Sequence, residues 1–181
     1  MAAGESTLEF ARDVHGCVQQ HIRFADTKAA AIIGFVAAVA GAIGVASRDL
    51  LRQPCDGPWL VAALVGAGLA LLAVVVFALI CVWNALHALL PRTWAAPGAL
   101  ASFPDIQQMA ETRYLEAVAG LDAHRVAQEY SRHTHILSRV ALEKFDAIKQ
   151  SIQHLRLFLI ASLSFLAMYV VARAIVVLVG G

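Results

Sequence analysis

The stretch AAAIIGFVAAVAGAIGVA, residues 29–46, decides the fold of this chain. Its eighteen residues carry no charge, and none of them is more polar than glycine. A helix rises about 1.5 Å per residue, so these residues would form a helix roughly 27 Å long, close to the roughly 30 Å hydrocarbon core of a bilayer. Residues 29–46 are therefore predicted to form a transmembrane helix.

The composition of the whole chain agrees with a place in a membrane and argues against a nucleic-acid-binding protein. Of its 181 residues, 60% are hydrophobic, and the mean hydropathy is +0.69. Lysine and arginine together number 14 and aspartate and glutamate 13, so the formal net charge is only +1. A chain so close to neutral has no overall field that attracts nucleic acid. We expect an integral membrane protein with no nucleic-acid partner.

Residues 1–28, which precede the first span, have the pattern of an amphipathic helix. Apolar side chains recur every three or four residues, as on one face of a helix: Leu8, Ala11, Val14, Val18, Ile22 and Ala25. No proline separates this segment from residue 29, so the helix is expected to run straight into the first span. The charged groups among residues 1–20 do not fit a signal peptide, and we therefore expect an uncleaved anchor.

Two further apolar segments predict a protein with three spans. A turn-forming segment that contains proline and glycine, residues 47–58, separates the first span from the second apolar segment. We expect residues 29–90 to form a transmembrane hairpin, with spans at about 29–46 and 59–84, and residues 157–181 to form the third transmembrane helix.

Residues 91–156 connect the second and third spans and carry many charges. A proline-containing connector is followed by a helix that is expected to begin near Ser102 and to be ended or kinked by Gly120. A second helix is expected to begin near Asp122, and its apolar pattern merges without a break into the third span near Leu157. The predicted fold is all-α: an N-terminal amphipathic helix, three transmembrane helices, and a helical hairpin that is continuous with the last span.

The distribution of basic residues predicts the orientation. One side of the membrane would carry Arg12, Arg23, Lys28, Arg92, Arg113, Arg125, Arg132, Arg139, Lys144, Lys149 and Arg156. The other side would carry only Arg48 and Arg52, with Arg173 near the end of the third span. Because basic residues are concentrated on the cytoplasmic side of membrane proteins, the N terminus and residues 91–156 are predicted to be cytoplasmic.

The sequence contains no pattern that indicates catalysis or a bound metal. It lacks a phosphate-binding glycine loop, a zinc-protease motif, a nucleophile elbow and a Cys-x-x-Cys pair. His133 and His135 are two residues apart, so on a helix they would point in nearly opposite directions and could not share a metal. Glu143 and Lys144 are expected to form an exposed pair of little energetic weight. We predict no enzyme, no metal and no cofactor.

The charged residues before the first span are the most informative about function. Arg23, Asp26 and Lys28 lie where a helix enters a medium of low dielectric constant, so they predict either an anion site or a salt-bridged lock. Asp26 would be costly there without a partner, and Lys28 or Arg23 can supply the positive charge. In a third interpretation the basic residues only anchor the helix, and Asp26 is incidental.

Two further groups of residues are candidates for a role. Lys144, Lys149 and Arg156 approach the same side of the membrane as Arg23 and Lys28, and all five are candidates to surround one pocket.

Within the first span, a face of small residues formed by Ala30, Gly34 and Ala38 would allow another helix to approach closely. The alternative is that the span is simply rich in alanine.

Two strings resemble the transmembrane effectors of the bacterial Pycsar anti-phage system. RFADTKAAAII, residues 23–33, contains an Asp-x-Lys-Ala motif like that of the family, and LEKFDAIKQSI, residues 142–152, contains a lysine followed by an aromatic residue. The commoner aromatic residue of the second motif is tyrosine, so Phe145 departs from the pattern and weakens any role for a phenol hydroxyl there. The resemblance covers nearly the whole chain.

The resemblance implies a membrane effector that is not an enzyme and that waits inactive in the bacterial inner membrane. A partner cyclase triggered by phage is expected to make cyclic UMP or cyclic CMP. The effector would then impair the membrane, and the infected cell would die before phage are released. We also expect a homo-oligomer, in which small-residue faces of the first two spans pair.

Sensing such a ligand requires a contact for one negative phosphate and a wall for the base. Candidate phosphate contacts are Arg23, Lys28, Lys144, Lys149 and Arg156. Candidate base walls are Phe145, Tyr114 and Tyr130, and Asp26 is the candidate lock.

Two other functions fit the residues alone. In the first, the cytoplasmic helices form an adaptor that binds a protein partner, and the spans only tether it. In the second, the chain is a small channel without nucleotide control, although its spans carry few polar groups for a hydrated path.

Overall fold

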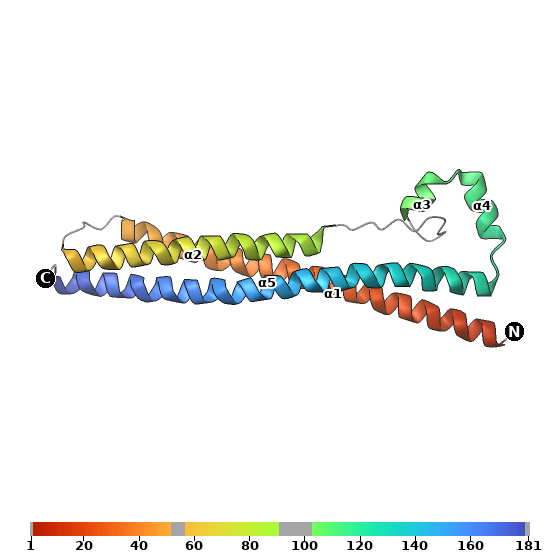
Figure 1. Ribbon diagram of the computed structural model, residues 1–181, viewed down its shortest axis with the longest axis horizontal. Coiled ribbons are helices and arrows are strands. Elements are labelled where there is room, and N and C mark those ends of the chain that lie inside the picture. The colour runs from red at the N-terminus through yellow and green to blue at the C-terminus, as the bar shows by residue number, and fades with distance from the viewer. Residues whose placement is uncertain (1, 52–56, 91–102, 180–181) are drawn as a thin grey trace. The chain divides into compact units, whose positions relative to one another are not determined.

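The computed structural model describes residues 2–51, 57–90 and 103–179, which form five α-helices (Figure 1). The helices are α1 (Ala2–Leu51), α2 (Pro58–Leu89), α3 (Phe103–Gln108), α4 (Glu111–Ala119) and α5 (Ala123–Val179). Three of them, α1, α2 and α5, are long and apolar enough to cross a membrane, so the chain is an all-α membrane protein, as predicted. The predicted turn-forming segment 47–58 is wrong in its first part, because α1 continues to Leu51. Residues 52–56 of that segment and the predicted connector at 91–102 lie outside the described residues.

α1 and α5 each pass from a polar segment into an apolar one without a break, as expected from the sequence. α1 joins the N-terminal amphipathic segment to the first span, and α5 joins the second helix of the predicted hairpin to the third span. Neither helix contains a proline, so no backbone hydrogen bond is lost along them for that reason. Asp122 caps the start of α5, because its Oδ1 accepts a hydrogen bond from the Arg125 amide at 2.8 Å.

The single helix predicted between Ser102 and Gly120 is wrong, because two short helices occupy this segment. The Met109 amide donates to the Ile106 carbonyl at 3.1 Å, which closes α3 with a tight turn. Ala110 then has an extended backbone, with φ −63° and ψ 139°, and α4 begins directly after it. The break contains neither proline nor glycine, so no local signal in the sequence marks it.

The chain divides into two compact units, and parts of α1 and α5 belong to each. We call residues 1–27 with 89–146 the head unit, and residues 28–88 with 147–181 the span unit.

In the span unit, α2 and α5 run antiparallel in close contact (Figure 1). A Cβ atom added to Gly66 would lie 3.4 Å from Met168 Sδ, so this glycine allows the two helices to approach. Further along, the Cys81 thiol donates to the Ser151 carbonyl at 3.3 Å, and the Ser151 hydroxyl donates to the Cys81 carbonyl at 2.9 Å. Small side chains and polar links of this kind hold helices together where lipid removes the hydrophobic driving force.

Within the described part of the chain, the predicted small-residue face of the first span packs against no other helix. Ala30, Gly34 and Ala38 are exposed, and no atom lies within 4 Å of the place that a Cβ would take at Gly34. The buried residues of α1 in the span unit are Ala29, Ile32 and Val36. Pairing through the small-residue face in an oligomer stays a prediction.

In the head unit, the first half of α1 lies beside the first part of α5 (Figure 1). His15 meets Thr134, and Asp26 meets Lys144, so the two helices run parallel here. Buried alanines line the contact on both helices: Ala11, Ala25, Ala127 and Ala141. α4 contributes no buried residue.

Candidate functional site

A buried ion pair joins α1 to α5 in the head unit. Lys144 Nζ lies 2.5 Å from Asp26 Oδ1, and only 6% of the Lys144 side chain is exposed, against 39% of the Asp26 side chain. A lysine this deeply buried requires a charged partner, and α1 provides one. The expectation that Lys144 lies on the surface is therefore wrong. The candidate lock at Asp26 engages a residue 118 positions away in the sequence.

A groove of about 600 Å³ lies between α1 and α5. Its lining residues are close in sequence to Asp26 and Lys144. We call it the Arg23 groove; its lining is Gln20, His21, Arg23, Phe24, Thr27 and Phe145. The rings of His21 and Phe145 meet edge to face with their centroids 6.4 Å apart. Arg23 and Phe145 therefore line the same groove. The sequence predicted Arg23 as a contact for the phosphate and Phe145 as a wall for the base.

The chemistry of the Arg23 groove suits a small anion that carries a flat ring. The Arg23 side chain is exposed, and it forms no ion pair with another of the residues that the structure describes. A guanidinium binds phosphate oxygens through a fork of N–H donors, and aromatic side chains provide a surface on which a base can stack. Gln20 and Thr27 add polar groups to the lining of the groove.

The other predicted phosphate contacts are not among the residues that line the Arg23 groove. Lys28, Lys149 and Arg156 are exposed residues of the span unit, and they do not line the Arg23 groove. Lys144 belongs to the head unit, but it is buried against Asp26. A role for these four residues in binding a phosphate stays a prediction.

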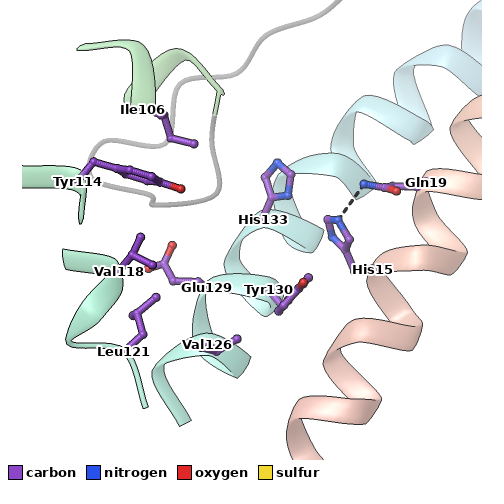
Figure 2. Close-up of a pocket in the computed structure, with 10 residues that line it drawn as sticks. All are labelled: His15, Gln19, Ile106, Tyr114, Val118, Leu121, Val126, Glu129, Tyr130 and His133. Atoms are coloured by element: carbon purple, nitrogen blue, oxygen red, sulfur yellow. Dashed lines mark hydrogen bonds between the residues drawn. The ribbon is translucent and has the colours of Figure 1, made fainter. Parts of the chain in front are cut away.

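The predicted base wall is divided between two places, because Tyr114 and Tyr130 line a second cavity of about 470 Å³ in the head unit (Figure 2). We call it the histidine cavity. Its lining residues are His15, Gln19, Ile106, Tyr114, Val118, Leu121, Val126, Glu129, Tyr130 and His133. The imidazole rings of His15 and His133 have their centroids 5.1 Å apart, and the Tyr130 ring meets His15 edge to face at 5.3 Å.

The hydrogen bonds around His15 indicate where its proton lies. The Thr134 hydroxyl donates to the Tyr130 carbonyl at 2.7 Å, so its oxygen is free to accept from His15 Nδ1 at 3.2 Å. His15 Nε2 then accepts from the Gln19 amide at 2.9 Å, and both ring nitrogens of the neutral imidazole have partners.

The histidine pair is held in its neutral form. Burial, with a smaller contribution from the charge of His133, lowers the pKa of His15. Burial also lowers the pKa of His133, although the nearby Glu129 carboxylate opposes this change. The histidine cavity therefore presents no cationic side chain near neutral pH, in contrast to the Arg23 groove.

Sequence reasoning missed His15, Gln19 and His21 as lining residues. His15 and Gln19 are four residues apart and must share a face of α1. Nothing in α1 alone indicates that α5 brings His133 or Phe145 to these faces, because that depends on how the two helices are rotated about their axes.

A family model described as the Pycsar effector protein domain matches residues 10–177, a range that includes the Arg23 groove and the histidine cavity. No curated protein and no solved structure matches the chain.

Proposed function

This chain belongs to the Pycsar effector family, and from that premise we propose that it senses a cyclic pyrimidine nucleotide and then impairs the bacterial inner membrane. Membership of the family makes the chain an anti-phage effector, and its three apolar helices make it a membrane protein. The ligand would be cyclic UMP or cyclic CMP, made by a partner cyclase during infection. The outcome would be abortive infection, in which the cell dies before phage are released.

The Arg23 groove is the observation that supports nucleotide sensing most directly. A cyclic pyrimidine nucleotide carries one negative charge on its phosphate and one flat base. In the proposed complex the Arg23 guanidinium contacts the phosphate, and the base stacks on Phe145. The groove belongs to the head unit, which the distribution of basic residues predicts to be cytoplasmic, where the cyclase product would accumulate.

The response of the membrane would depend on α1 and α5, because both helices contribute to the groove and both continue into spans. In the proposed mechanism, the ligand favours a different packing of these two helices in the head unit. The change would alter how the spans pack, and the exposed face of Ala30, Gly34 and Ala38 would then pair between protomers.

Binding to the purified protein tests the assignment of the groove. We expect Arg23→Gln to weaken binding of cyclic UMP or cyclic CMP about tenfold, because a charge-assisted hydrogen bond to the phosphate is lost. Arg12→Gln is the matched control, since Arg12 is exposed on the same helix and does not line the groove. Equal affinities of both variants and the unchanged protein would remove Arg23 from the site.

Dye uptake by bacteria tests the function itself. Cells that express the protein with an active cyclase should take up a membrane-impermeant dye, and cells with an inactivated cyclase should not. Uptake without any cyclase would favour a channel that needs no nucleotide. Harmless expression beside an active cyclase would favour the adaptor.

A further inference from the structure

The residues that the structure describes leave the apolar wall of the histidine cavity open. Tyr114 and Val118 of α4 lie one turn apart, and with Leu121, which follows α4, they face the cavity (Figure 2). None of the residues of α4 is buried, so the apolar face of this helix is only partly covered. Ile106 and Val126 extend the same wall. An occupant with an apolar body would cover this surface and gain the free energy of burial.

The polar part of the cavity contains a carboxylate, whereas the Arg23 groove contains a guanidinium. Glu129 lines it together with Tyr114, Tyr130 and His133, and no lysine or arginine is among the lining residues. Figure 2 shows the Tyr114 side chain extending from α4 into the space beside Glu129 and His133. Neither tyrosine hydroxyl is hydrogen-bonded to another residue within the described ranges, so both can serve a ligand.

We propose that the histidine cavity binds a small organic cation, a protonated amine with an apolar or aromatic body. The ammonium group would donate hydrogen bonds to the Glu129 carboxylate and the tyrosine hydroxyls, and the aromatic rings around it favour a positive charge. The body of the ligand would cover Ile106, Val118 and Leu121. An anion is disfavoured, because it would meet the carboxylate and no cationic side chain.

This site is separate from the proposed nucleotide site. The two cavities share no lining residue and select opposite charges. Because the histidine cavity is lined by residues of α1, α3, α4 and α5, an amine would hold α4 against the rest of the head unit. Binding of an amine in the histidine cavity therefore does not depend on nucleotide sensing.

Three probes of similar size and different charge test the proposal on the full chain in lipid nanodiscs. They are 2-phenylethylamine, 2-phenylethanol and phenylacetate, titrated calorimetrically, with empty nanodiscs as the blank for partitioning into lipid. We expect the amine to bind at least about tenfold more tightly than the alcohol, and the acid not to bind. Equal affinities for the three probes, or preference for the acid, would overturn the proposal.

A matched pair of variants then tests the role of the carboxylate. Glu129→Gln keeps the shape of the side chain and removes its charge, so the preference for the amine over the alcohol should fall about tenfold. Glu116→Gln should keep the preference, because Glu116 is exposed on α4 and does not line the cavity. If Glu129→Gln keeps the preference for the amine, Glu129 is not the contact of the ammonium group and the proposal is refuted. If this variant also loses binding of the alcohol, Glu129 serves only the fold, and the proposal is refuted as well.

Discussion

Lys144 carries its charge at a position that water hardly reaches, and Asp26, its partner, is half open to solvent. Because of this difference in exposure, we expect the two single variants to lose different amounts of stability. Asp26→Asn removes the carboxylate that lies against the buried ammonium and should destabilise the head unit by about 3 kcal/mol. Lys144→Met removes the buried charge, leaves a carboxylate that solvent can reach, and should cost no more than about 1 kcal/mol.

Denaturation of the solubilised protein checks this order, with the double variant as a control. Asp26→Asn combined with Lys144→Met should recover most of the stability that Asp26→Asn alone loses, because no charge remains buried. Equal losses in the two single variants would show that the ion pair is not buried in solution.

At the scale of single elements, the contact between α1 and α5 in the head unit should weaken in acid. Burial lowers the pKa of both His15 and His133, so the unfolded chain binds protons more readily than the folded chain below about pH 6.5. The contribution of the two neutral histidines to the stability of the head unit is therefore complete above that pH and is lost as the pH falls below it. His15→Gln should make the thermal midpoint of the head unit less dependent on pH.

His135→Gln is the control for this acid effect, because His135 is exposed on the same helix as His133 and does not line the histidine cavity. Thermal unfolding followed by circular dichroism at about pH 7.5 and pH 5.5 compares the variants. An acid-induced loss of stability that is the same in both variants would place its origin outside the histidine pair.

The elements themselves were largely predictable, whereas their contacts were not. Runs of apolar residues and the lack of proline predicted three spans and two long unbroken helices. The break between α3 and α4 at Ala110 escaped prediction, because no residue there disfavours a helix. The partner of Asp26 also escaped, because it comes from a helix far away in the sequence, and helical periodicity says nothing about which faces of two helices meet.

At the scale of the whole molecule, α5 is one continuous helix from Ala123 to Val179 and so links residues of the Arg23 groove to the third span. Gln150→Pro would remove one hydrogen bond of this helix and clash with the Asp146 carbonyl, at a cost of about 3 kcal/mol. We expect this variant to bind the cyclic nucleotide and to lose dye uptake. Gln150→Ala should retain both.

Under the proposed function, this variant separates nucleotide binding in the Arg23 groove from the response of the membrane. Uptake that survives Gln150→Pro would mean that the signal does not travel along α5. Loss of nucleotide binding would mean that the groove itself depends on the intact helix.

The parallel contact of α1 with α5 also has a consequence for the making of the protein. Residues near the start of the chain meet residues that are synthesised much later, as the pairs His15 with Thr134 and Asp26 with Lys144 show. A ribosome delivers the first two spans to the membrane before it has made either partner residue of α5. The head unit cannot form during that interval, so a nascent or prematurely terminated copy lacks the Phe145 wall of the Arg23 groove and, under the proposed function, could not bind the nucleotide.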